Sequence, residues 1–267
     1  MPLTINSNRE AASITKNLDK SLKAQQKSFE KLSSGKRITR ASDDAAGLAI
    51  AARITADADV LRVAARNTSD AVSVTDVASS LYDTSGQIVD RLTELAAQSA
   101  NGVLSDTQRS ALNQEFQSLS AELDRQSASS EFNGQQLSGG SFSFNVGSGS
   151  DVQLNIASLN SQALGVASQN VSSQAAAQTA LDQLKTARDS INQQAGSVGA
   201  VQSQLYSNYD RISNAIPVLR ETASRIQDAD VAEETSNLVR NKILAKGGAS
   251  LLAQANISQQ TALQLLR

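Results

Sequence analysis

Apolar residues recur at spacings of three and four through much of the second half of this chain. Two polar positions, Arg188 and Gln202, fill the gaps in a series made up of Ala177, Leu181, Leu184, Ile191, Ala195, Val198, Leu205, Tyr209, Ile212, Ile216, Leu219, Ala223 and Ile226. Such regularity indicates a coiled-coil-like seam. Pro217 lies inside the series, and because proline removes a backbone donor and clashes with the preceding turn, we expect a kink or a break there.

Helical patterns also fill the first half of the chain. We expect a first helix over about residues 6–31 that closes at Ser33-Ser34-Gly35, because glycine readily adopts the left-handed conformation that ends a helix. A second helix is expected over about residues 45–100. The Ser42-Asp43-Asp44 cluster before it supplies a capping side chain and two carboxylates at the positive end of that helix.

Two sets of charges near helix starts have alternative interpretations. The loop with Lys36, Arg37 and Arg40 has the positive charge of a phosphate-binding site, but it lacks the residue spacing of a P-loop, and two carboxylates follow it directly. This pattern favours a solvated loop or a loop that forms ion pairs between subunits. The pairs Asp43-Asp44 and Glu233-Glu234 are more simply explained as charges that complement the helix dipole than as a cation site.

A third helix and a β-hairpin follow the second helix. Asn101-Gly102 ends the second helix, and Ser105 with Gln108 forms a capping-box pattern for the third. The buried stripe of that third helix is expected at Leu112, Phe116, Leu119 and Leu123. Alternating apolar residues predict a hairpin near residues 141–157, on one strand Phe142, Phe144 and Val146 and on the other Val152, Leu154 and Ile156.

These elements predict a mainly α fold: an elongated, antiparallel, coiled-coil-like helical bundle with a small β-hairpin tip. If the two long halves pack antiparallel, the hairpin lies at one end of the bundle and both termini lie at the other. Five Phe, three Tyr and no Trp leave packing to Ala, Leu, Val and Ile, as in slender helix contacts.

Composition argues against several classes of function. The chain has no His and no Cys, so it lacks the usual proton shuttle, thiol nucleophile and zinc ligands, although a carboxylate-only metal site remains formally open. We therefore expect no enzyme and no cofactor. A net charge of −2 without a basic stripe speaks against nucleic acid as a partner. Neither a cleaved signal peptide nor a membrane span is visible, so export would need a dedicated route.

Both ends of the chain carry apolar stripes at helical spacing. Chain ends of soluble domains are normally frayed and polar, and a thin helical pair cannot bury two such stripes completely. A heptad series runs through Val231, Leu238, Ala245, Leu252 and Leu266, broken only by Gln259. Assembly with other copies or partners is the leading explanation, through candidate residues Ile14, Leu18, Leu22, Phe29, Leu32, Leu238, Leu252 and Leu266.

Collinear motifs at both ends of the chain closely resemble bacterial flagellins. Residues 31–38 (KLSSGKRI) and 42–51 (SDDAAGLAIA) are similar to the N-terminal signature of that family. Residues 94–102 (ELAAQSANG) and 132–134 (FNG) resemble the end of its long N-terminal helix and the turn before its β region. In the C-terminal half, residues 224–230 (SRIQDAD), 251–256 (LLAQAN) and 265–267 (LLR) agree with it as well.

The resemblance implies an extracellular structural subunit of the flagellar filament, exported without a cleaved signal peptide and serving motility. It implies an inner-tube domain of residues 1–40 with 229–267, and a helical rod domain of residues 41–228 without variable outer domains. The implied partners are further copies, sister flagellins, an export chaperone at the C-terminal segment, and the filament cap and hook-junction proteins. The Ser-rich residues 158–178 are a plausible site of O-glycosylation by the same analogy.

Other functions remain as alternatives. A hook-filament junction protein shares comparable terminal helices, and a membrane-active secreted protein would use the same apolar ends against lipid, although the modest positive charge of the polar faces argues against it. The resemblance also implies a surface read by the vertebrate innate flagellin receptor. Arg91, Leu95 and Glu115 match that surface, whereas Asp90 replaces the usual Gln and exchanges an amide donor for a charge.

Overall fold

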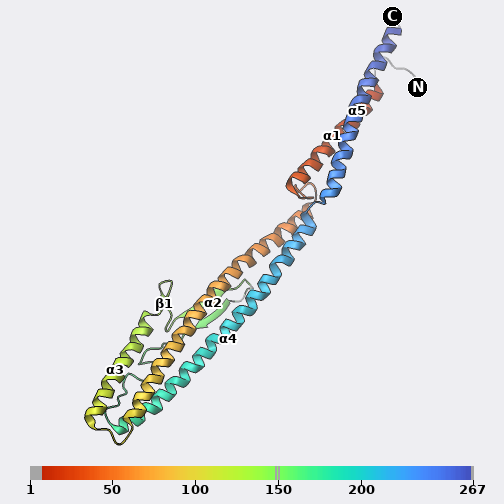
Figure 1. Ribbon diagram of the computed structural model, residues 1–267. Coiled ribbons are helices and arrows are strands. Elements are labelled where there is room, and N and C mark those ends of the chain that lie inside the picture. Colours follow the sequence, from red (N-terminus) through yellow and green to blue (C-terminus); the bar gives the residue numbers. More distant parts are fainter. Residues whose placement is uncertain (1–7, 148, 150, 266–267) are drawn as a thin grey trace. The chain divides into compact units, whose positions relative to one another are not determined.

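The structure is a computed structural model that describes residues 8–147, 149 and 151–265 (Figure 1). Within that part of the chain, three helices come first, followed by four short strands and then two further helices. The helices are α1 (Arg9–Ser34), α2 (Ala45–Ser99), α3 (Asp106–Ser129), α4 (Gln174–Gln227) and α5 (Val231–Leu265), and the strands are β1 (Glu131–Phe132), β2 (Gln135–Gln136), β3 (Ser141–Asn145) and β4 (Asp151–Asn155).

The chain forms two compact units, and α2 and α4 contribute to both. The first unit draws on residues 1–57 and 218–267, and the second on residues 58–217. The expected mainly α fold is confirmed: long antiparallel helix pairs dominate, accompanied by two small two-stranded antiparallel sheets. The expected inner-tube and rod domains concern layers of a filament, so that division stays a prediction.

Local chemistry explains where the elements begin and end. Gly35 closes α1 in the left-handed conformation, with φ of 69°, as its sequence position predicts. The predicted capping box at α3 is present, with Ser105 and Gln108 each accepting from the other's backbone N–H. Asn133 and Gly134, with φ of 50° and 76°, form the tight turn between β1 and β2. The predicted start of the first helix lies outside the described residues; the described helix begins at Arg9 after the cap Asn8.

In the second unit, α2 and α4 run antiparallel and share an apolar core. Gln202 Nε2 of α4 donates to Asp76 Oδ1 of α2 at 2.6 Å, and Arg188 Nε of α4 lies 3.2 Å from Asp90 Oδ1 of α2. The later residue of α2 thus contacts the earlier residue of α4, as in an antiparallel pair. The core residues are mostly small or aliphatic, as composition predicts, and include Val74, Ala78, Leu81, Val89, Leu92, Ala177, Leu184, Ile191 and Val198.

Helix α3 runs beside α2 (Figure 1) and packs against this core through the predicted stripe. Phe116 and Leu123 are fully buried, and Leu112 and Leu119 are partly buried against the same cluster. Arg109, itself buried, donates to the backbone oxygens of Ser99 and of Leu104, the latter at 3.0 Å. This cation therefore binds the Ser99 carbonyl at the negative end of α2 and the Leu104 carbonyl in the turn, and so holds the turn into α3.

The β3–β4 hairpin forms with the predicted alternation, but it lies along α2 rather than at the end of the helix pair. Asn67 Nδ2 donates to the carbonyl of Asn145 at 3.3 Å, and the Ala157 backbone N–H donates to the Tyr82 hydroxyl at 3.1 Å. A two-stranded hairpin is only marginally stable alone. The hairpin is therefore stabilised by contact with the helices: Val146 and Val152 pack against Ala71 of α2 and Leu205 of α4.

Pro217 does not break α4, which is one helix from Gln174 to Gln227. Both Pro217 and Ser213, whose carbonyl loses its helical donor, are exposed. That carbonyl therefore remains accessible to water, which lowers the cost of the missing hydrogen bond. The expected break is thus absent. Among the described residues, none of the helices has the length and apolar character of a membrane span.

Candidate self-assembly surface

In the first unit, the terminal helices α1 and α5 pack side by side in antiparallel orientation (Figure 1). Lys31 Nζ lies 2.6 Å from Glu234 Oε1, near the end of α1 and the start of α5. Toward the other end, Asn8 Nδ2 donates to the carbonyl of Ala255 at 3.2 Å. Between them, Gly248 lies against Leu18. The N-terminal and C-terminal helices thus form one pair with a constant register.

The candidate assembly residues divide between two environments. Five of them are half-buried: Ile14, Leu18, Leu32, Leu238 and Leu252. They share the periodicity of the paired positions, so they contribute to the contact between α1 and α5. Leu22 and Phe29 are exposed, with 48% and 63% of their surface accessible, and remain open to another molecule. Leu266 lies outside the described residues.

A second apolar face of α5 was not identified from the sequence. We call it the outer stripe: Val239, Ile243, Leu244, Leu251 and Ile257, which are 49% to 64% exposed. The heptad positions Leu238, Ala245 and Leu252 lie half-buried or buried on the face toward α1. The first four residues of the outer stripe fall between these positions, and Ile257 follows Leu252. The signal was present in the sequence as apolar residues outside the heptad series. A helix that is apolar on both faces normally has both faces covered.

The two linkers that border the terminal helices bind each other. Lys36 and Asp228 form an antiparallel bridge. The N–H of Ala229 donates to the carbonyl of Gly35 at 2.9 Å, and the N–H of Arg37 donates to the carbonyl of Gln227 at 2.7 Å. The guanidinium of Arg37 also donates to the carbonyl of Ile226 at 2.7 Å, so part of the predicted basic loop closes the C-terminal end of α4.

Asp43 and Asp44 organise the first linker. The Asp44 carboxylate accepts from the Gly47 N–H at 2.8 Å and caps α2, so Asp44 rather than Ser42 supplies the described capping bond. Asp43 lies 2.7 Å from Lys27 of α1 and accepts from the N–H and hydroxyl of Thr39. The Lys27 ammonium, supported by these hydrogen bonds, holds the pKa of the Asp43 carboxyl well below its usual range.

Comparison with known proteins identifies the family. A model of the bacterial flagellin N-terminal helical region matches residues 5–143, and a model of the bacterial flagellin C-terminal helical region matches residues 181–266. The flagellin of Halalkalibacterium halodurans is 35% identical, over 99% of this chain and 100% of its own length. The chain belongs to the bacterial flagellins. It is a structural subunit of the flagellar filament, not an enzyme.

Further similarities agree with this family. The flagellar filament 33 kDa core protein of Treponema phagedenis is 33% identical, over 99% of this flagellin and 100% of its own length. A putative flagellar hook-associated protein from Vibrio parahaemolyticus has a TM-score of 0.60 at 12% identity, covering 70% of this chain and 100% of that chain, which shows a shared fold alone. Only residues 144–180 separate the two matched regions of this flagellin, so it lacks a large variable domain there, as expected.

The residues expected at an innate-receptor surface divide between two separate groups of ion pairs and the apolar core. Arg91 of α2 bonds Glu94 at 2.8 Å and Glu115 of α3 at 2.7 Å, and these carboxylates raise its pKa. Asp90 is paired with Arg188 of α4. Leu95 is 1% exposed and belongs to the core, so its side chain does not lie on the surface of this flagellin.

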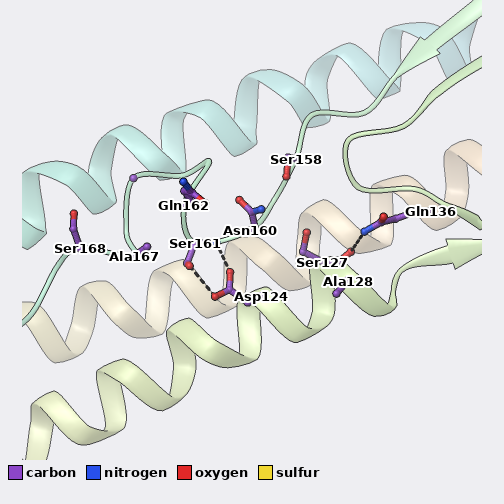
Figure 2. Close-up of a pocket in the computed structure, with 11 residues that line it drawn as sticks. Asp124, Ser127, Ala128, Gln136, Ser158, Asn160, Ser161, Gln162, Ala167 and Ser168 are labelled. Carbon is purple, nitrogen blue, oxygen red and sulfur yellow. Dashed lines mark hydrogen bonds between the residues drawn. The ribbon is translucent and has the colours of Figure 1, made fainter.

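A polar pocket of about 720 Å³ lies between α3 and the segment that follows β4, within the Ser-rich region of this flagellin (Figure 2). Asp124 is its charged residue, and both carboxylate oxygens already accept from the N–H and hydroxyl of Ser161, at 2.7 and 2.8 Å. Asp124 therefore anchors the loop. Among the described residues there is no cluster of metal-ligating side chains, here or elsewhere.

Proposed function

We propose that copies of this flagellin pack in the filament through the outer stripe of α5, together with the exposed Leu22 and Phe29 of α1. One observation carries the proposal: α5 is apolar on two faces, and α1 covers only one of them. Burial of apolar surface is the main favourable contribution to protein association. A second copy of the chain is the occupant because the family builds a polymer of identical subunits.

The magnitude is sufficient for reversible polymerisation. Full burial of an aliphatic side chain contributes about 1.5–3 kcal/mol, and each residue of the outer stripe still has about half of its surface to bury. The five residues together therefore offer about 4–7 kcal/mol per subunit before the entropic cost of ordering, which multiple neighbours in a filament share. Basic side chains on α5, among them Arg240, Lys242 and Lys246, are exposed and available for ion pairs between copies.

The same apolar faces fit the partners that the family implies. Before assembly the uncovered stripe would favour loose terminal helices, suited to passage through a narrow export channel and to capture by a helical export chaperone at α5. Filament cap and hook-junction proteins, and sister flagellins with comparable terminal helices, would bind the same surface at the ends or within the filament.

Deletion of residues 245–267 tests the central proposal. The truncated protein should stay soluble and helical, because the second unit has its own core, but it should not extend sheared filament seeds in electron micrographs. The full-length chain with Asn256→Ala, an exposed polar change on α5 outside the outer stripe, serves as the control that should still extend seeds. Filaments formed by the truncated protein would contradict the proposal.

We further infer that the vertebrate receptor recognises this flagellin weakly. The Asp90 carboxylate is engaged by Arg188, and it carries a charge where receptor-activating relatives are expected to present an amide donor. Asp90→Gln should therefore raise activation in a receptor reporter-cell assay. Equal or lower activation by that variant would refute the inference.

A further inference from the structure

The two compact units carry opposite net charges. Residues 1–57 and 218–267 contain 16 basic and 11 acidic residues, a net charge of +5, whereas residues 58–217 contain 8 basic and 15 acidic residues, a net charge of −7. Together they give the −2 of the whole chain, whose near balance conceals this separation. The first unit of one copy is therefore attracted to the second unit of another copy, whereas like units repel.

Helix α1 concentrates basic charge on one face. Arg9, Lys16 and Lys23 follow each other at spacings of seven residues, Lys20 lies between the last two, and all four are exposed. We call these four residues the basic row. Lys16 precedes Leu18 by two residues, about 200° around a helix, and Leu18 packs against α5. The basic row therefore lies on the face of α1 that points away from α5.

The basic row is not neutralised within the subunit. In the described part of α1, the residues that form ion pairs are Lys27, Glu30 and Lys31, so none of these pairs includes a member of the row. Asp19 lies beside the row, but it also forms none of these pairs. Like charges three or four residues apart destabilise a helix. Carboxylates from another molecule would relieve this repulsion.

Helix α2 carries acidic residues at the same seven-residue spacing. Asp76, Asp83 and Asp90 are exposed and form what we call the acidic row. Asp76 accepts from the neutral Gln202 and so keeps its full charge, whereas Asp90 lies 3.2 Å from Arg188. Asp83 has no ion pair among the described residues. The acidic row is therefore negative, and its uncompensated centre is Asp83.

The two rows match in their spacing along the helix. Seven residues span about 10.5 Å of helix, so Arg9, Lys16 and Lys23 of one copy can meet the three carboxylates of another copy at once. Lys16 and Asp83 are the middle members, and they meet whether the helices run parallel or antiparallel. Opposite charges at heptad spacing select partner helices in coiled coils. An anionic lipid surface would supply charge without this fixed spacing.

We propose that the basic row of α1 docks on the acidic row of α2 of another copy in the filament. The proposal rests on the self-assembly of this flagellin, and it adds a charged contact on helices other than the one that bears the outer stripe. Apolar burial is not directional, whereas matched charges fix the register of an interface and suppress wrong pairings. The rows therefore decide where the first unit of one copy meets the second unit of another.

Reversal of charge tests the pairing of the two rows. The α1 variant makes the basic row acidic at its heptad positions, through Arg9→Glu, Lys16→Glu and Lys23→Glu. The α2 variant makes the acidic row basic, through Asp76→Lys, Asp83→Lys and Asp90→Lys. A combined variant carries all six changes. The matched control reverses three exposed carboxylates of the second unit outside the row, through Asp70→Lys, Asp182→Lys and Asp189→Lys.

The readout is the critical concentration of seeded polymerisation at low ionic strength, where exposed charges are least screened. The α1 and α2 variants should each raise it at least about tenfold, whereas the combined variant and the control should stay within about threefold of wild type. An equimolar mixture of the α1 and α2 variants should polymerise better than either alone. An equal rise in the control, or no recovery in the combined variant and the mixture, would overturn the proposal.

Carbodiimide cross-linking of wild-type filaments gives a readout that needs no variant. The reagent activates the Asp83 carboxylate, and the Lys16 amine displaces it to form an amide bond. When ¹⁵N-labelled and unlabelled copies are mixed, mass spectrometry should find this link between chains. Its absence from filaments whose other carboxylates have reacted would contradict the docking.

Two comparisons separate this contact from other uses of the same helices. If the α1 variant polymerises as wild type does but loses binding to phosphatidylglycerol vesicles, the basic row serves a lipid surface and the proposal fails. Ile243→Ala with Leu251→Ala leaves both rows intact. Normal polymerisation of that variant would refute the outer stripe alone, without changing what the charge reversals and the cross-link show.

Discussion

Removal of apolar surface from the outer stripe should weaken polymerisation without weakening the subunit. Ile243→Ala combined with Leu251→Ala removes three carbons at each position, where 64% and 60% of the residue is exposed. At about 0.8 kcal/mol per buried methylene, and with about six tenths of each side chain left to bury, each change costs about 1.4 kcal/mol of subunit contact. The two together cost about 3 kcal/mol, which corresponds to about a hundredfold rise in critical concentration.

The assay is seeded polymerisation followed by sedimentation, with the critical concentration read from the protein left in solution. Alanine has the higher helix propensity and both positions are exposed in the subunit, so thermal unfolding of the monomer should be unchanged. Asn256→Ala, an exposed change on the same helix that removes a polar side chain outside the outer stripe, should leave the critical concentration unchanged. A critical concentration of the double variant within about threefold of wild type would refute the reasoning about buried area.

Three further outcomes concern the two units themselves. Ser85→Ala should raise the free energy of unfolding by about 1 kcal/mol in urea, because the buried Ser85 hydroxyl has no hydrogen-bond partner in the described structure; a loss of stability would contradict this. Gly86→Ala should stabilise by about 1 kcal/mol in an Arg188→Ala background but by less in wild type, where the added Cβ would displace the Arg188 guanidinium; a double-mutant cycle without coupling would refute it. Asp43→Asn should lower the free energy of unfolding at neutral pH and reduce the loss of stability that the wild type shows as the pH falls. Because Lys27 lowers the pKa of Asp43, the ionised carboxylate stabilises the fold above the ordinary pKa of aspartate, and this stabilisation declines as the pH falls through the lowered pKa. Curves of stability against pH that run parallel for the variant and the wild type would contradict this prediction.

Much of the fold was predictable because it depends on local chemistry. The glycine at position 35, the capping box at Ser105 and the alternation in the hairpin each act through residues close in sequence, and all three are observed. The position of the hairpin was not predictable in this way. It depends on long-range contacts such as Asn67 with Asn145, which no local pattern specifies.

For the candidate assembly surface, the sequence indicates apolar terminal helices but not the direction that their residues face. Periodicity identifies an apolar helix face, yet α5 is apolar on both sides, so the pattern does not reveal which side α1 covers. The heptad positions Leu238 and Leu252 proved half-buried, and the residues between them proved exposed. Leu95 illustrates the same difficulty, because a family motif gave its position and only packing showed that it belongs to the core.

The mutual hydrogen bonds of the two linkers have a mechanical consequence. Because Gly35 and Arg37 bond Ala229 and Gln227 through their backbones, the two connections form a short antiparallel ladder. A tensile load that enters through the terminal helices is divided between two covalent strands, and neither strand can extend until the bonds that cross between them have been broken. A subunit built in this way resists stretching where the terminal helices join α2 and α4.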